Sequence, residues 1–125
     1  MRLGLDYHGV IDKYPELFGT LSRIITASGG QVYIITGHRA TPEFALSLEQ
    51  LGIEYTEVLS VVDFNQRHGV EVRYDEKGDP WIDEEVWNAT KAHLCELYSI
   101  DTHVDDSEVY GKYFKGKTKY LLIKI

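Results

Sequence analysis

The chain has little cysteine and no long hydrophobic run. Its only cysteine is Cys95, so no disulfide can form within the chain, and a reducing compartment is expected. No stretch approaches the roughly 20 apolar residues that cross a bilayer, and the first residues lack the pattern of a secretory signal. We therefore predict a cytoplasmic protein that does not enter a membrane.

Basic residues are also in the minority. Lysine and arginine number 13 against 20 aspartates and glutamates, and the net charge is −7. A nucleic-acid-binding surface would need a basic face, so the composition gives no strong nucleic-acid signal. The 125 residues include 43% hydrophobic ones and no linker rich in proline, glycine or serine. These properties predict a single globular domain over residues 1–125.

Apolar segments of two kinds alternate along the chain. Helical spacing of apolar residues, with proline or acidic residues at the start, predicts helices over 15–28, 41–51 and 83–97. β-rich segments predict strands over 2–7, 31–37, 55–62, 102–106 and 120–125. This alternation predicts an α/β fold with three α/β/α layers, Rossmann-like, around a parallel sheet.

One segment interrupts the alternation. Residues 69–83 contain two short β-like stretches around a turn with Gly78, which predicts an inserted β-hairpin. Two interpretations stay open. The hairpin is either an ornament on the sheet edge or a small lid in which Tyr74 and Trp81 cover a bound substrate.

Polar residues stand where the predicted strands end. Asp6, Thr36 and the pair Asp105-Asp106 each follow an apolar strand, and parallel sheets bind ligands beyond the carboxyl ends of their strands. Adjacent carboxylates are unfavourable unless a cation compensates them. Phosphoryl transfer through a covalent intermediate needs a nucleophilic carboxylate, a divalent cation, donors to the phosphate and a positive charge, which Lys91 would supply.

Four segments carry a resemblance to a known family. The stretches "LGLDYHGVID" (3–12), "VYIITGHR" (32–39) and "HVDDSE" (103–108), with Lys91 near a helix start, resemble the four motifs of the haloacid dehalogenase-like hydrolases. Their order and spacing match, and the resemblance covers the chain from residue 3 to about residue 110. It implies the fold of that family, with the hairpin as its only insertion.

The resemblance implies a magnesium site. Asp6 would be the nucleophile that becomes an aspartyl-phosphate and would also bind Mg²⁺, together with the backbone carbonyl of His8. Asp105 would hold the ion as well, and Asp106 would bind it through water or orient Lys91.

The resemblance also implies a phosphate site. Thr36 and the amide of Gly37 would bind the transferring phosphoryl group, and Lys91 would neutralise charge between nucleophile and phosphate. His38 and Arg39 follow this turn, and we expect them to contact substrate or to lie on the surface.

His8 departs from the family pattern. Family phosphatases usually have a second aspartate two residues after the nucleophile, which protonates the leaving group and then activates water. Either the imidazole, with an ordinary pKa of ~6.5, takes over these proton transfers, or the function has moved elsewhere or been lost. Asp12 lies beyond the turn, which makes it a poor substitute. His68, His93 and His103 lack zinc-ligand spacing.

The leading hypothesis is a magnesium-dependent phosphatase that acts on a small phosphorylated substrate or a phosphorylated macromolecule. The alternative is a domain of the same fold that binds a phosphorylated ligand or partner without efficient turnover. A response-regulator receiver domain is disfavoured, because its acidic pair belongs to the first strand. Without a large cap, the site is expected to be open to bulky substrates or to be covered by a partner subunit, and self-association stays open.

Overall fold

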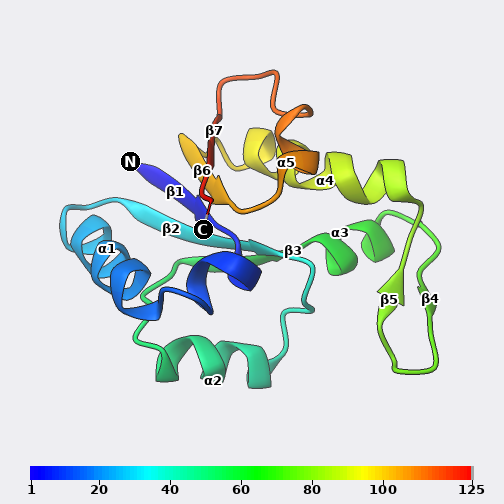
Figure 1. The fold of residues 1–125 in the computed structure, drawn as a ribbon, viewed down its shortest axis with the longest axis horizontal. Helices are drawn as coiled ribbons and strands as arrows, with labels where there is room; N and C mark the ends of the chain where they lie inside the picture. Colours follow the sequence, from blue (N-terminus) through cyan, green and yellow to red (C-terminus); the bar gives the residue numbers. More distant parts are fainter. Residues whose placement is uncertain (125) are drawn as a thin grey trace.

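A computed structural model describes residues 1–124 and shows a five-stranded parallel sheet flanked by helices (Figure 1). The strand order is β3-β2-β1-β6-β7, and the register pairs Leu5 with both Ile34 and Val104. The strands are β1 (Arg2–Leu5), β2 (Gln31–Thr36), β3 (Glu57–Ser60), β6 (Thr102–Asp105) and β7 (Lys119–Leu122). The helices are α1 (Pro15–Ala27), α2 (Pro42–Gln50), α3 (Val61–Arg67), α4 (Glu84–Leu97) and α5 (Glu108–Gly111). The expected α/β architecture with a parallel sheet is confirmed.

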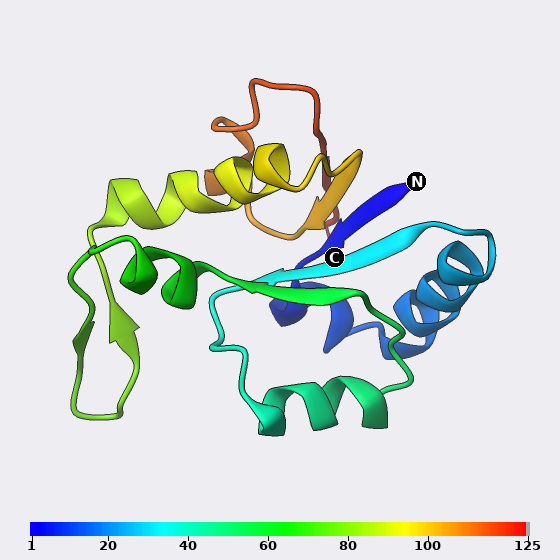
Figure 2. The ribbon, with the colours of Figure 1, turned by 180° about the vertical axis from the view of Figure 1, so that it is seen from behind.

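The side chains of β2 show how the sheet is buried on both faces. Val32 and Ile34 join a core with residues of α1 and α2, whereas Tyr33 and Ile35 join a core with residues of α3 and α4. Successive side chains of a strand point to opposite faces, so a strand with apolar residues at consecutive positions needs cover on both sides. The two views of the ribbon show these helices on opposite sides of the sheet (Figures 1 and 2).

The connections reverse direction at β1. The chain runs outward from β1 through β2 to β3 and then returns to place β6 on the other side of β1. In open α/β sheets, ligands bind at such a reversal point, beyond the carboxyl ends of the strands. Asp6 follows β1 and Asp105 ends β6, so the reversal lies between the two carboxylates.

The strand expected over 55–62 is shorter, since β3 covers only residues 57–60. An unpredicted helix, α3, follows it directly. β3 ends at Ser60, whose hydroxyl accepts a hydrogen bond from the Asp63 amide and so begins α3. The buried Val61 and Val62 therefore belong to a helix rather than to a strand. A serine cap of this kind outweighs the β propensity of two valines. The short helix α5 was also not predicted, and residue 125 of the expected last strand lies outside the described residues.

The expected hairpin is present as an antiparallel pair, β4 (Arg73–Tyr74) and β5 (Pro80–Trp81). Its turn is organised by Asp75, whose Oδ1 accepts hydrogen bonds from the amides of Lys77 and Asp79. The hairpin projects from one end of the molecule beyond α3 and α4 (Figures 1 and 2). Among residues 1–124, no helix is both long and apolar enough to cross a membrane.

Candidate active site

Lys91 joins the two carboxylates at the reversal point of the sheet. Its Nζ lies 3.0 Å from Oδ1 of Asp6 and 2.8 Å from Oδ2 of Asp105, and all three side chains are buried. Lys91 reaches this position from the middle of α4, one turn or more inside the helix rather than at its start. Its ammonium group also lies 4.6 Å from the ring centre of Tyr110, in a cation–π contact. The structure thus brings three of the predicted site residues together.

Asp105 is saturated with hydrogen bonds. Its Oδ2 accepts from Nζ of Lys91 and from Nε2 of the buried His103, at 2.8 and 2.9 Å. Its Oδ1 accepts from the amides of Asp106 and Ser107, at 2.8 and 3.1 Å. A carboxylate has about four lone-pair positions, so these four donors use them all. Asp105 is therefore held rigidly and has little remaining capacity for another ligand.

Asp6 and Asp106, in contrast, keep free oxygens. Oδ1 of Asp6 accepts from the Tyr7 amide at 2.9 Å and from Lys91, and its Oδ2 has no donor among residues 1–124. Oxygens of Asp6, Asp105 and Asp106 all lie within 4.8 Å of one another. The Asp106 carboxylate lies against Gly9, where an added Cβ would come within 1.9 Å of Oδ2. Gly9 also has a φ of +78°, so both the space and the backbone require glycine there.

The charges of the site shift the pKa values of its groups in opposite directions. Burial raises the pKa of Asp6 to about 7, and the nearby Asp105 charge adds to this shift, although Lys91 opposes it. Burial alone would also raise the pKa of Asp105, but the hydrogen bond from His103 and the charge of Lys91 hold it below its usual range. Burial lowers the pKa of Lys91, yet the two carboxylates outweigh that effect and raise it. Lys91 is therefore charged and Asp105 ionised, whereas Asp6 needs further positive charge to ionise fully near neutral pH.

His103 supports Asp105 from behind. It is fully buried, and burial lowers the pKa of its imidazole, so the neutral ring donates from Nε2 to Asp105. Gly4 makes room for this ring, because a Cβ there would lie 2.9 Å from Nδ1 of His103. The sequence spacing of His103 bears only on zinc binding, so this role was not predicted.

The expected phosphate turn follows β2. Thr36 is buried, and its Oγ1 accepts a hydrogen bond from the His38 amide at 3.1 Å, which leaves the hydroxyl hydrogen free to donate. Gly37 lies against the indole of Trp87, since a Cβ at Gly37 would come within 2.8 Å of two ring carbons. Trp87 was not among the predicted site residues. No spacing rule connects it with Gly37, because the contact arises only when α4 packs beside the end of β2.

His8 belongs to a chain of polar contacts at the surface. Its side chain is 70% exposed, its Nδ1 lies 3.2 Å from Oδ2 of Asp12, and its Nε2 lies 2.7 Å from Nε2 of His38. Asp12 also accepts from the Gly9 amide at 2.7 Å. Burial and the neighbouring His8 lower the pKa of His38, which favours its neutral form. The neutral ring can accept a hydrogen bond from Nε2 of His8. Asp12 was expected to be a poor substitute for the acid because it lies beyond the turn, and the turn η1 (Tyr7–Ile11) folds it back onto His8.

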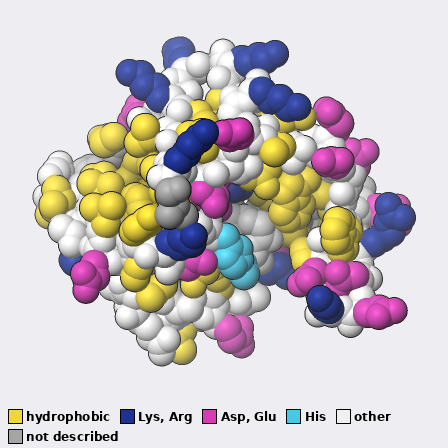
Figure 3. All heavy atoms as spheres, in the orientation of Figure 1, with side chains coloured by type: hydrophobic (Ala, Val, Ile, Leu, Met, Phe, Trp, Pro, Cys, Tyr) yellow, Lys and Arg dark blue, Asp and Glu magenta, His cyan; other side chains and the backbone are white. Residues whose placement is uncertain are grey.

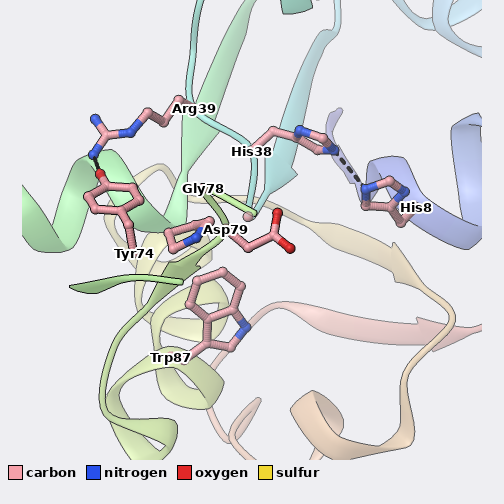
Figure 4. Close-up of a pocket in the computed structure, with 9 residues that line it drawn as sticks. His8, His38, Arg39, Tyr74, Gly78, Asp79 and Trp87 are labelled. Carbon is pink, nitrogen blue, oxygen red and sulfur yellow. Dashed lines mark hydrogen bonds between the residues drawn. The ribbon is translucent and has the colours of Figure 1, made fainter. Parts of the chain in front are cut away.

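A cavity of about 410 Å³ lies between these histidines and the hairpin. Its lining residues are His8, Gly37, His38, Arg39, Tyr74, Gly78, Asp79, Pro80 and Trp87 (Figure 4). In the space-filling view, a histidine and acidic side chains gather near the middle of one face, with a hydrophobic area between them and the hairpin (Figure 3).

The two aromatic residues of the hairpin, which would cover a substrate if the hairpin is a lid, border different cavities. Tyr74 lines the cavity beside the histidines, and its hydroxyl accepts a hydrogen bond from Arg39. Trp81 does not line this cavity. It is 60% exposed, donates from Nε1 to Asp75 and borders a neighbouring cavity instead. The two interpretations of the hairpin, an ornament or a lid, therefore both stay open.

The other histidines and Cys95 have packing roles. His68 and His93 contact the ring of Phe64. In the part of the chain that the structure covers, the aspartates 6, 105 and 106 form the one cluster suited to a metal ion. Cys95 is buried as predicted, and burial raises the pKa of its thiol to about 12.

Comparison with protein-family models and with curated proteins found no match to this chain. The structure itself shows an α/β fold with a parallel sheet and a polar site at its reversal point. That site combines three carboxylates, one buried ammonium group, a free threonine hydroxyl and an adjoining cavity with aromatic walls.

Proposed function

We propose that this protein is a magnesium-dependent phosphatase of the haloacid dehalogenase type, acting through an aspartyl-phosphate on Asp6. The observation that carries the proposal is the bridge from Lys91 to Asp6 and Asp105 at the reversal point of the sheet. A buried lysine between two carboxylates, with a third carboxylate beside them, leaves a net negative charge that a divalent cation would balance. A structural role alone would be served better by apolar residues of similar volume.

The donor set suits Mg²⁺. Magnesium prefers oxygen ligands and is commonly held by one or two carboxylates together with phosphate oxygens. Asp6 and Asp106 have the free oxygens. Asp105, by contrast, accepts four hydrogen bonds and so positions Lys91 and the backbone amide of Asp106. We therefore assign direct binding to Asp106, with the backbone carbonyl of His8 as a further ligand, and leave Oδ2 of Asp6 free to react. This reverses the roles of Asp105 and Asp106 that the family resemblance implied.

The free oxygen of Asp6 is placed to act as the nucleophile. Oδ2 attacks phosphorus, the ester P–O bond breaks, and the leaving oxygen takes a proton from His8. Water then attacks the aspartyl-phosphate, His8 removes a proton from that water, and Asp6 is released with inorganic phosphate. Bound Mg²⁺ would stabilise the negative charge that develops on the phosphoryl oxygens.

The remaining residues hold the phosphoryl group. The Thr36 hydroxyl and the Gly37 amide donate to its oxygens, and Lys91 compensates the charge between those oxygens and Asp6. Lys91 does this without losing its contact with Asp105, which fixes its position. The Thr36 oxygen already accepts from the His38 amide, so its hydroxyl hydrogen is available to donate to the phosphoryl group.

His8 supports a second candidate function. Its Nε2 is engaged by His38 at 2.7 Å, so the atom that should transfer the proton is occupied. If this contact persists with substrate, the protein binds a phosphorylated ligand and turns it over poorly. Asp12 favours the alternative in which His8 is active, because its carboxylate lies 3.2 Å from Nδ1 of His8 and can orient the imidazole ring.

A panel of phosphate monoesters assayed with Mg²⁺, then with a chelator, then with Mg²⁺ restored, tests the proposal. We expect hydrolysis that disappears with the chelator and returns with the metal. Hydrolysis that persists in excess chelator would remove the proposed mechanism. Binding of phosphate esters without hydrolysis of any of them would favour the second candidate.

A further inference from the structure

The cavity beside the phosphate turn has a composition that selects the rest of the substrate. We infer that it takes the leaving group of a phosphate monoester and favours one that is planar, aromatic and not negatively charged. This inference rests on the proposed function, since it places the phosphoryl group at Thr36 and Gly37.

The position of the cavity follows from Trp87. Its indole ring lies directly against Gly37, and both residues line the cavity. A group attached to a phosphate at Gly37 would therefore leave the phosphate along the face or edge of this ring. The indole is fixed, because its Nε1 donates to the Tyr110 hydroxyl at 3.2 Å.

The opposite wall is the hairpin. Tyr74 and Pro80 lie across from the histidines, and Pro80 also borders a neighbouring cavity of about 440 Å³, together with Trp81 and Trp87. Aromatic rings and proline provide flat apolar walls, which suit a planar ring better than a branched or puckered one. The two adjoining cavities give room for a leaving group larger than a single ring.

The charges around the cavity disfavour an anionic leaving group. Asp79 lines the cavity with no hydrogen-bond partner for its carboxylate among residues 1–124, and Figure 4 draws that carboxylate between the Trp87 ring and the imidazole of His38. Arg39 is the one cation of the lining other than the histidines, and it is already paired with Asp63 at 3.2 Å and bonded to Gln66 and Tyr74. On the hairpin side of the cavity, the uncompensated charge that faces a ligand is therefore negative.

Three esters with the same type of leaving oxygen separate shape from charge. Benzyl phosphate presents a planar ring, cyclohexylmethyl phosphate a puckered ring of similar size, and 4-carboxybenzyl phosphate a planar ring with a negative charge. We expect kcat/KM for benzyl phosphate to exceed that for cyclohexylmethyl phosphate by about three- to tenfold, as a ring stacked on an indole would give. The carboxylate should lower kcat/KM by about tenfold.

Asp79→Asn tests the origin of the charge selection. We expect the ratio of kcat/KM between benzyl and 4-carboxybenzyl phosphate to fall to within about twofold of unity. Glu76→Gln is the matched control, because it removes the same charge from the exposed turn of the same hairpin without lining the cavity, and it should leave the ratio unchanged. If both variants change the ratio equally, net charge rather than Asp79 sets the selection, and this part of the inference is overturned.

An equilibrium measurement keeps the inference separate from catalysis. The chain has 2 tryptophans, so the indole N–H groups give two NMR signals, which Trp81→Phe assigns. In the Asp6→Asn protein with Mg²⁺, benzyl phosphate should shift the Trp87 signal, whereas inorganic phosphate and cyclohexylmethyl phosphate should shift it much less. A selective shift without turnover in the wild-type protein would overturn the proposed function and keep the aromatic pocket. Metal-dependent turnover with equal rates for the two neutral rings and no selective shift would overturn the pocket and keep the proposed function.

Discussion

Removal of the Lys91 charge should destabilise the protein more at alkaline than at acidic pH. Lys91→Met keeps the length and apolar character of the side chain but leaves Asp6 and Asp105 without their shared cation. Breaking a buried ion pair from one side costs about 3–5 kcal/mol, a large share of the roughly 5–15 kcal/mol that stabilises a domain. We expect a cost in this range at pH 8.

The pH dependence follows from Asp6. Its pKa is raised by burial to about 7, well above its value in the unfolded chain, and loss of Lys91 raises it further. A carboxyl group of this kind binds a proton more tightly in the folded state, so its stabilising contribution is complete below pH ~4 and is lost as the pH rises through the folded pKa. One further pKa unit corresponds to about 1.4 kcal/mol, so the cost of Lys91→Met at pH 5.5 should be about 1 kcal/mol or more below that at pH 8.

Urea unfolding of the wild-type and Lys91→Met proteins at pH 5.5 and pH 8, with chelator present, measures the cost of the substitution in the free energy of unfolding. Lys117→Met is the control, because Lys117 is exposed and its loss should change the free energy of unfolding by less than about 0.5 kcal/mol. The reasoning is refuted if Lys91→Met costs no more than the control, or if its cost is greater at pH 5.5 than at pH 8.

Two further predictions concern the first turn. Gly9→Ala should abolish Mg²⁺ binding measured by calorimetry, because the added Cβ displaces the Asp106 carboxylate, whereas Gly29→Ala, with a similar φ of +86° but open space, should cost stability alone. Equal effects on metal binding would contradict the role of Asp106. His8→Ala should slow hydrolysis of alkyl phosphates by about 10²–10⁴-fold and of activated aryl phosphates much less, and His8→Asp should restore the rate. If His8→Ala has no effect on any ester while His8→Asp creates activity, the native protein is a phosphate-binding domain.

The sheet could be predicted because its information is local. Residues 32–35 carry apolar side chains at consecutive positions, which needs cover on both faces and indicates a central parallel strand. Helix starts were equally readable, since Thr41 caps α2 and Asp83 caps α4 where expected. The end of β3 was missed, because a single serine cap decided between strand and helix.

The candidate site likewise has residues that the sequence could identify and residues that it could not. Residues at strand ends, such as Asp6 and Asp105, could be identified because topology brings the carboxyl ends of parallel strands together. Trp87 and Asp79 could not be identified, since their place beside the phosphate turn depends on how α4 and the hairpin pack. The contact of Asp12 with His8 was missed because the positive φ of Gly9 reverses the chain within one turn.

The central claim is that Asp6 is the nucleophile, and Asp6→Asn tests it most directly. The substitution keeps the shape of the side chain and removes the attacking oxygen, with Asp101→Asn at the opposite end of β6 as the control for loss of one carboxylate. For benzyl phosphate with saturating Mg²⁺, we predict that kcat/KM falls by at least ~10³-fold in Asp6→Asn and changes little in Asp101→Asn, with the circular dichroism of both variants like that of the wild-type protein. Turnover by a folded Asp6→Asn protein at a rate near that of the wild type would contradict the account.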